Sequence, residues 1–475
     1  MSERNEVDAA LSRAAAESVW EMWTSVAQRR PAFVAALLFG AWAAAIALAP
    51  SLTLKAVLAA PALLIPTAWW TVLRPGRWLV LFLATALLLP PLPIPIGDSG
   101  PHLCLLFAVL GLFAAALSPN SWRIDPSGPA AALVTLTGIL LASVASAAWH
   151  SGLPAAAGSL ARVGLFGISL LVFFSPREGA PGLRALYWIA AASALFACVD
   201  FYYQFPAPAG YGPQFVWLDS GVYRRAQGFF YEASTLGNFC AFFLVMIAVA
   251  FSRPRAESPV SRKALAAGGA IFFAALVLSY SRASLVGVAV AVAVLVWRNR
   301  SRVRFERLAA GAVAAAVLTW QIFPSFAEMY WLRLSATAEY LFSATNGVLS
   351  GRVASWNTLL GWIEAHPWEV LFGIGYKTLP YTTYLGDPIV ADNMYLSLLV
   401  ETGIAGLAAL LWLNLSILRA AARASHSSDP RRAFCGTWML CFWAGEIVQM
   451  ASGDLLTYWR VLPVYFFVLA MAVRA

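Results

Sequence analysis

Four arginines occur in stretches where lysine and arginine are otherwise scarce, and their side chains suit anion binding. Arg224 and Arg225 are adjacent, Arg282 lies between two apolar runs, and Arg352 opens a stretch with helical periodicity. A guanidinium is planar and permanently charged, so it can bind two phosphate oxygens at once. These arginines therefore indicate a phosphate or pyrophosphate ligand. The alternative is that each one pairs with a nearby carboxylate or reaches lipid phosphate.

Carboxylates near these arginines are the candidates for a general base. Asp392 is followed by Asn393 where a long loop enters an apolar run, and a carboxylate there can take the proton of an attacking hydroxyl. Glu232 and Glu401 are the second choices. The alternative for Asp392 is a helix N-cap, with Asn393 bonded to local backbone. The sequence has no Asp-x-Asp, Walker or HExxH pattern, so we expect no metal and no cofactor.

The elements that hold these residues are predicted to be membrane helices. The chain has 475 residues, of which 61% are apolar and 12% are charged, and its mean hydropathy is +0.72. Typical soluble domains are roughly 45–50% apolar and about 25% charged. The excess is far larger than one signal peptide or anchor helix adds. The composition excludes a soluble enzyme, a nucleic-acid binder and a disordered protein.

Apolar runs long enough to cross a bilayer number about 14, because a spanning helix needs about 20 mainly apolar residues. Twelve or 13 crossings remain open, since one run ends in several prolines and another is short. Long apolar runs without period-2 alternation favour helices over a barrel, which predicts an all-α polytopic membrane protein. The predicted runs are 32–50, 54–73, 78–96, 101–118, 130–149, 157–174, 184–201, 234–252, 264–281, 283–297, 308–323, 395–418, 433–450 and 456–473.

The net charge of +9 indicates the orientation of these spans. With a cytoplasmic N-terminus, every strongly basic short loop falls on the cytoplasmic side, which also makes the C-terminus cytoplasmic. The chain then divides into a cytoplasmic segment at 1–30, helices at 31–323 with an outer loop at 202–233, a long outer loop at 324–394, and the last helices at 395–475.

The two outer loops are longer than a connection needs, and loops of that length usually carry function. Trp356, Leu359, Leu360 and Ile363 recur at helical spacing until Pro367, which predicts an amphipathic helix at the outer membrane interface. The four arginines lie on this outer side and break the positive-inside pattern. A guanidinium at the edge of hydrocarbon is costly without an anion, so these residues are predicted to be functional. A polyprenyl-phosphate carrier would supply that anion.

Six short motifs then occur in a recognisable order. They are Arg225-x-x-Gly228-x-Phe230, Ser281-Arg282-Ala283, Gly351-Arg352-x-x-x-Trp356, Gly373-x-Gly375, Asp392-Asn393-x-x-Leu396 and Glu401-x-Gly403-x-x-Gly406. In this order and topology, the stretch from about residue 200 to about 420 resembles the O-antigen ligase and O-antigen polymerase superfamily of membrane glycosyltransferases. The resemblance implies a GT-C-like helical fold with a helical periplasmic loop.

The resemblance also implies a reaction and a place for it. It is a metal-independent, inverting transfer of a glycan from undecaprenyl pyrophosphate at the periplasmic face of a bacterial inner membrane. Arg225 and Arg282 would hold the pyrophosphate, Asp392 would act as base, and Arg352, Arg224, Asn393 and Glu232 would bind substrate. The implied partners are the undecaprenyl-pyrophosphate-linked oligosaccharide, membrane lipid, and flippase and chain-length regulator proteins.

One departure from the ligase pattern bears on which reaction is expected. Ligases of this group typically have His-Asn where this chain has Asp392-Asn393, which looks more like the polymerase branch. The resemblance therefore favours polymerisation of O-antigen, capsule or exopolysaccharide repeats. Ligation of the glycan to lipid A core or to protein is the first alternative. A lipid-linked oligosaccharide flippase is the second, although a flippase should have short outer loops and internal repeats.

Overall fold

The structure is a computed structural model in which the chain forms two compact units. It describes residues 37–92, 101–119, 128–208, 211–218, 221–298, 319–324, 326–328, 352–386 and 388–474, with four single positions outside these ranges. The first unit, Met1–Leu73, contains a helix at Leu37–Leu48 and α2 at Leu52–Leu73. The second unit, Arg74–Ala475, contains everything that follows.

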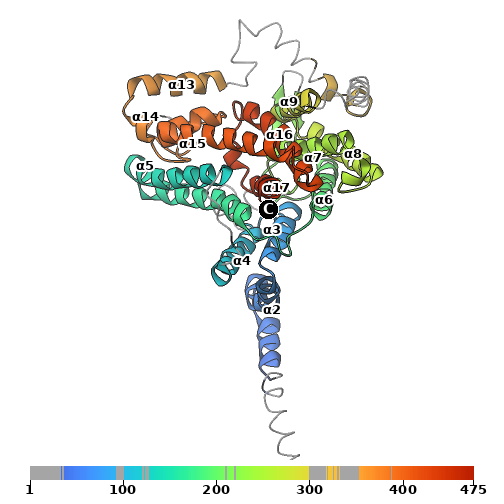
Figure 1. Ribbon diagram of the computed structural model, residues 1–475. Coiled ribbons are helices and arrows are strands. Elements are labelled where there is room, and N and C mark those ends of the chain that lie inside the picture. The colour runs from blue at the N-terminus through green and yellow to red at the C-terminus, as the bar shows by residue number, and fades with distance from the viewer. Residues whose placement is uncertain are drawn as a thin grey trace, which may run out of the picture. The chain divides into compact units, whose positions relative to one another are not determined.

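The second unit is built almost entirely of helices (Figure 1). The α-helices are α3 (Trp78–Leu88), α4 (Leu103–Leu117), α5 (Pro129–Phe174), α6 (Leu183–Tyr203), α7 (Ala233–Ser252), α8 (Arg262–Leu278), α9 (Arg282–Arg298), α13 (Arg352–Ala365), α14 (Glu369–Phe372), α15 (Met394–Ala424), α16 (Pro430–Gln449) and α17 (Leu462–Val473). Short 3-10 helices are η1 (Pro75–Arg77), η3 (Gly228–Phe230), η4 (Arg255–Glu257) and η5 (Leu455–Thr457). One antiparallel hairpin pairs β1 (Phe215–Leu218) with β2 (Gly221–Arg224).

The predicted fold class is confirmed: this is an all-α polytopic membrane protein. Among the described residues, α5, α6, α7 and α15 are long and apolar enough to cross a membrane, and several shorter apolar helices accompany them. Every predicted run overlaps a helix, although 78–96 is helical only to Leu88 and 456–473 only from Leu462 in its α-helix; most of the run 308–323 lies outside the described residues. Two predicted runs, 130–149 and 157–174, form the single element α5, which is broken at Gly152.

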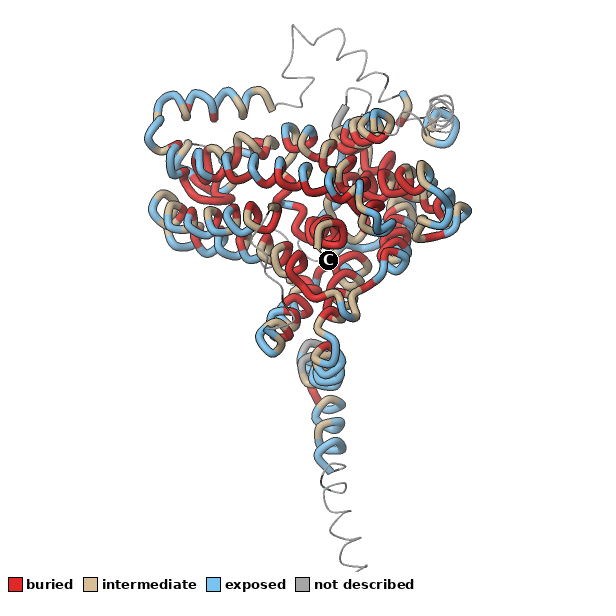
Figure 2. The backbone as a smooth tube through the Cα atoms, in the orientation of Figure 1, coloured by how far each residue is buried: buried red, intermediate tan, exposed pale blue. Residues whose placement is uncertain are grey.

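The core of the second unit surrounds the last helix. Every residue of α17 from Leu462 to Ala472 is buried, and the helix packs against α5, α15 and α16 (Figure 2). Small residues bring neighbouring helices close together: a Cβ added to Gly445 of α16 would lie 2.4 Å from the carbonyl oxygen of Gly287 in α9. Close approach at small residues is the usual basis of helix association in membranes, where burial of apolar surface gives little driving force.

A break in α15 shapes the outer end of this core. Gly403 has φ 72° and ψ −171°, so the helix stops and restarts there. The backbone N–H groups of Ile374 and Gly375 donate to the carbonyl oxygens of Val400 and Glu401, at 3.0 and 2.8 Å. The break therefore receives the segment after α14, and the carbonyls that lost helical partners are satisfied. Irregular backbone at membrane depth is tolerated only when it is paired in this way.

The break makes Gly403 intolerant of any side chain. A Cβ there would lie 2.3 Å from the carbonyl oxygen of Leu371, and φ is positive. Gly403→Ala should reduce stability by roughly 2 kcal/mol or more, which lowers the thermal midpoint Tm of the purified protein. Gly138→Ala in α5 is the control, because nothing lies within 4 Å of its added Cβ. Equal Tm values for the two variants would contradict the role of the break.

Candidate functional site

A cavity of about 880 Å³ opens in the second unit and collects most of the residues singled out by the sequence. All of its lining segments belong to loops or span ends that the arginine distribution assigns to the outer side. Six cations and four carboxylates among the described residues line it, so its formal charge is +2. They are Arg162, Arg225, Arg282, Arg352, Lys377, Arg460, Glu232, Asp392, Glu401 and Asp454.

Arg225 is positioned by the end of the β-hairpin and by the end of α8. Its backbone N–H donates to the carbonyl oxygen of Gln214 at 2.9 Å. The backbone N–H of the next residue, Ala226, donates to the carbonyl oxygen of Leu278 at 2.8 Å. The guanidinium Nε donates to the carbonyl oxygen of Ser279 at 2.9 Å. The carbonyl acceptor carries no formal charge and sets the direction of the guanidinium at the cavity.

Arg282 stands at the N-terminus of α9, directly after a three-residue connection from α8. The connection contains Tyr280 with φ 53°, and the hydroxyls of Ser281 and Ser284 lie 2.7 Å apart. Gly237 of α7 allows this turn to approach, since a Cβ there would lie 2.5 Å from Ser281 Cβ. The positive end of the α9 dipole and the Arg282 guanidinium thus lie at the same edge of the cavity, which favours an anion there.

Asp392 is held at the cavity by its neighbours on both sides. The indole of Trp356 in α13 donates to the carbonyl oxygen of Ala391 at 2.7 Å, and Arg352 Nε donates to Asp392 Oδ2 at 3.1 Å. The N-cap of α15 is Asn393, whose Oδ1 accepts from the N–H of Leu396 at 3.1 Å. The N-cap alternative for Asp392 is therefore wrong, and its carboxylate is left for the cavity.

Two residues predicted to bind substrate are placed elsewhere. The side chain of Asn393 serves as the helix cap and does not line the cavity. Arg224 lies 3.8 Å from Asp200 of α6 and is also outside the cavity lining. Arg224 is the last residue of β2 and lies beside Asp200, whereas Arg225 follows the strand and lines the cavity.

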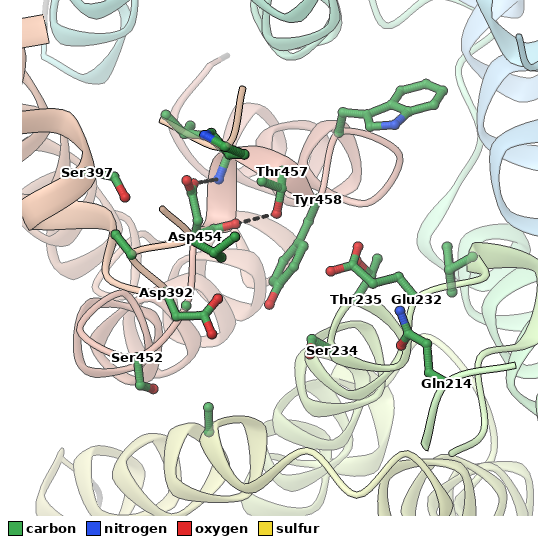
Figure 3. A pocket seen from close by; sticks show the side chains of 18 of the residues that line it. Gln214, Glu232, Ser234, Thr235, Asp392, Ser397, Ser452, Asp454, Thr457 and Tyr458 are labelled. Carbon is green, nitrogen blue, oxygen red and sulfur yellow. Dashed lines mark hydrogen bonds between the residues drawn. The ribbon is translucent and has the colours of Figure 1, made fainter. Parts of the chain in front are cut away.

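Glu232 lies at the N-cap position of α7, across the cavity from Asp392 (Figure 3). Tyr458 lies between the two carboxyl groups in this view. Thr235 donates its hydroxyl to Glu232 Oε2 at 2.6 Å. Burial raises the pKa of Glu232, while the Thr235 hydrogen bond and Arg225 oppose that shift. Glu232 and Asp392 thus lie in different surroundings within one cavity.

Glu401, the other second choice for a base, has a structural task. It is 2% exposed, and its Oε1 accepts from the N–H of Leu379 at 3.3 Å. Glu401 lies in α15 just before the break at Gly403, so its hydrogen bond to Leu379 connects the turn containing Lys377 to α15. We infer that Glu401 shapes the cavity wall.

The chain segment that supplies Arg282, Arg352 and Asp392 also matches a known family. Residues 267–411, from α8 into α15, match the family model described as O-antigen ligase. The resemblance to the O-antigen ligase and polymerase superfamily is confirmed. The match supports a function of the ligase or polymerase type in a membrane protein. No curated protein matches the chain.

The cavity also includes cations that the sequence reasoning missed. Arg162 of α5 donates to the carbonyl oxygen of Lys377 (2.9 Å) and to the hydroxyl of Tyr381 (2.7 Å). Arg460 is 6% exposed and donates to the carbonyl oxygens of Ala86 and Leu89. Both arginines lie near the outer ends of predicted spans, so the rule that identified Arg282 would also have found them.

Lys377 and Asp454 form an ion pair in the cavity wall, and the sequence reasoning missed it too. Lys377 is one of only three lysines in the chain and follows the Gly373-x-Gly375 motif, which was the available signal. Asp454 Oδ1 also accepts from the N–H of Leu456 at 3.1 Å, so the pair fixes the start of η5. Figure 3 shows Asp454 bonded at this wall.

Backbone strain gathers at the same cavity. In the described part of the chain, five non-glycine residues have positive φ, and four of them line the cavity. The four are Tyr231, Tyr280, Lys377 and Asp392. Such residues cost about 1–3 kcal/mol each and cluster at active sites and ligand clamps. The concentration supports a functional role for the cavity that is independent of the family match.

The ion pair between Lys377 and Asp454 should contribute to the stability of the protein. The side chains of Lys377 and Asp454 are only 9% and 16% exposed. Lys377→Met should lower stability by about 1–3 kcal/mol, less than for a fully buried pair, because Asp454 still meets the cavity. Adding Asp454→Asn should restore part of the lost Tm, since the amide keeps the bond to Leu456 without an unpaired charge.

An exposed ion pair provides the control for this measurement. Arg74 lies 3.8 Å from Glu178, and their side chains are 56% and 70% exposed. Arg74→Met should change stability by at most about 0.5 kcal/mol. If Lys377→Met were as mild as Arg74→Met, or if Asp454→Asn worsened it, the pair would not stabilise the cavity wall.

Proposed function

We propose that the protein polymerises saccharide repeats carried on undecaprenyl pyrophosphate. The observation that carries this proposal is the single cavity in which Arg225, Arg282 and Arg352 lie with Asp392. The arginines suit a pyrophosphate, and the carboxylate suits an attacking hydroxyl. The donor glycan is already activated by its carrier, so the reaction needs no nucleotide sugar.

The arginines act on the leaving group. Arg225 and Arg282 bind the pyrophosphate oxygens, and Arg282 does so together with the N-terminus of α9. Negative charge on these oxygens grows as the bond to the sugar breaks. Cations fixed in advance by the backbone stabilise that charge more strongly in the transition state than in the bound donor. They therefore accelerate the step as well as binding the carrier.

Asp392 acts on the acceptor. The acceptor hydroxyl oxygen attacks the anomeric carbon from the face opposite the pyrophosphate, and its proton passes to Asp392. The new glycosidic C–O bond forms as the old C–O bond breaks, and the electron pair leaves on the carrier pyrophosphate. One attack from the opposite face inverts the configuration. Arg352, which pairs with Asp392, holds the carboxylate in place and lies where it can also contact phosphate.

The cavity also has surface for the sugar. Its lining is part polar and part aromatic, and the flat faces of tyrosine and tryptophan rings suit the apolar faces of sugar rings. The aromatic residues of the lining include Tyr211, Tyr231, Tyr280, Tyr376, Tyr381, Tyr458 and Trp459. In the proposed topology this cavity faces the periplasm of a bacterial inner membrane, and both chain termini are cytoplasmic.

The second candidate is ligation of the glycan to lipid A core or to protein, and the description of the matching family model favours it. The polymerase proposal rests on Asp392 standing where ligases typically have histidine. Product analysis separates the two reactions: polymerisation lengthens chains that stay on the undecaprenyl carrier, whereas ligation removes them from it. A flippase would move the lipid-linked glycan without lengthening it.

The role of Arg282 is tested by elongation of undecaprenyl-pyrophosphate repeats with purified protein. Arg282→Gln should slow elongation about 10²–10³-fold, as expected when one preorganised charge stabiliser is lost. Arg282→Lys should recover part of the rate, because it keeps the charge but loses the planar fork. Arg255→Gln is the control, since Arg255 is exposed in η4 and outside the cavity lining. An Arg282→Gln enzyme as fast as this control would exclude the role.

The identity of the base is tested by two carboxylate variants. Asp392→Asn should lower the elongation rate about 10²–10⁴-fold while donor binding is largely kept. If Glu232 were the base, the rate would rise with pH through a value above the usual glutamate range, because burial raises the pKa of Glu232. Glu232→Gln would then remove that rise. We expect Glu232→Gln to keep the pH profile, and loss of the rise would transfer the role to Glu232.

A further inference from the structure

A second group of arginines surrounds two smaller cavities, at the end of the second unit formed by loops of the predicted cytoplasmic side. The first cavity, of about 260 Å³, is lined by Arg177, Arg431, Arg432 and Arg474 with Asp429 as the one carboxylate. Its formal charge is therefore +3. The second cavity, of about 400 Å³, shares Arg432 and Arg474 and adds Arg423.

Two of these arginines are fixed by the ends of helices. Arg432 donates to the carbonyl oxygens of Ala472 and Val473, both at 3.3 Å, at the end of α17. Arg474 donates to the carbonyl oxygen of Phe173 at the end of α5. Cations at helix C-termini are ordinary caps, so these bonds explain why the two arginines are ordered. The carbonyl acceptors carry no formal charge, so the formal charge of the cavity lining stays +3.

Arg177 is not explained by such a cap. Its Nη2 is buried and has no hydrogen-bond partner among the described residues. Burial, and then the charges of Arg474, Arg431 and Arg432, lower the pKa of Arg177 to about 10. A buried guanidinium nitrogen without an acceptor is costly, and like charges nearby add to that cost.

The carboxylates closest in sequence are engaged elsewhere. Asp429 caps α16 by accepting from the N–H of Arg431 at 2.9 Å. Glu178 lies 3.8 Å from Arg74 and its side chain is 70% exposed. Within the described ranges, Asp429 is the one carboxylate in the lining of this cavity, against four arginines.

We propose that this cavity binds a phosphate-bearing anion, which accepts hydrogen bonds from Arg177 and lies among the guanidinium groups of Arg431, Arg432 and Arg474. The other walls include Pro181, Phe467 and Met471, and the second cavity is lined in part by Phe173 and Phe174. Apolar walls beside a phosphate site suit the headgroup region of an anionic phospholipid. Inorganic phosphate shares the same anionic chemistry and lacks the acyl chains.

Binding is measured on the full-length protein in non-ionic detergent, by the rise in Tm during titration. The probes are dihexanoylphosphatidylglycerol, inorganic phosphate, and dihexanoylglycerol, which lacks phosphate. We expect a saturable rise with the first probe and none with dihexanoylglycerol. If inorganic phosphate binds equally well and depends on Arg177, the site stands and its ligand is free phosphate. Equal effects of dihexanoylglycerol and the phospholipid would overturn the proposal, because apolar contact alone would explain them.

Three arginine variants separate a built site from bulk surface charge. Arg177→Gln should weaken phosphatidylglycerol binding about tenfold, as expected for a lost hydrogen bond to a charged group. Arg431→Gln should weaken phosphatidylglycerol binding less. Because Arg431 is exposed, this substitution should leave the folded protein intact. Arg255→Gln removes an exposed charge of the same predicted side and should leave binding unchanged. Equal losses in all three variants would overturn the proposal, whatever the elongation assay shows.

Discussion

The helix break at Gly403 is the constraint on which the outer cavity depends. A spanning helix normally satisfies all of its own backbone groups, and a break inside the membrane is expensive unless other groups replace the lost bonds. Here Ile374 and Gly375 supply those bonds. The same contact fixes the turn that carries Tyr376 and Lys377, and the first half of α15 begins two residues after Asp392, following the N-cap Asn393. These two backbone hydrogen bonds therefore position two walls of the cavity.

The cations that line the outer cavity have two kinds of partner. Arg225, Arg162 and Arg460 donate to backbone carbonyl oxygens. A carbonyl fixes direction but removes no charge, whereas a carboxylate would do both. Arg352 and Lys377 do pair with carboxylates, namely Asp392 and Asp454. The result is an ordered cavity with an excess of cations, which is the electrostatic condition for holding an anionic leaving group.

The fold was largely predictable from the sequence because bilayer thickness imposes a length on each apolar run. The positions of helices such as α7 and α16 followed from that rule alone. The break at Gly152 lies in the gap between two predicted runs, 130–149 and 157–174. The break at Gly403 was not predicted, because a glycine in an apolar run looks the same whether the helix continues or stops. The hairpin at Phe215–Arg224 was also missed. Each of its strands has only four residues, which is too short for an alternating pattern to stand out in the sequence.

The site was predictable where motif and topology agreed, and less so where a single bond decides. Arg225, Arg282, Arg352, Glu232 and Asp392 all reach the cavity, because each stands at an outer span end or loop that the charge pattern assigns to one side. Arg224 and Asn393 do not reach it. Arg224 ends β2 beside Asp200, and the N-cap of α15 occupies Asn393. The first effect is not visible in residue type, whereas the second agrees with the alternative that Asn393 bonds local backbone, since asparagine is a common N-cap.

Arginine has two tasks in this protein, and the number of arginines on a side does not separate them. On the predicted cytoplasmic side the residues are numerous, as orientation in a membrane requires, and most are exposed or cap helix ends. Arg177 differs because its Nη2 is buried without a partner in the described part of the chain. On the predicted outer side the arginines are few, and among the described ones Arg162, Arg225, Arg282, Arg352 and Arg460 line one cavity while Arg224 does not. We propose that a binding arginine on either side is distinguished by its place in a cavity lined by more cations than carboxylates. That is a property of packing, so it emerges only when the helices are assembled.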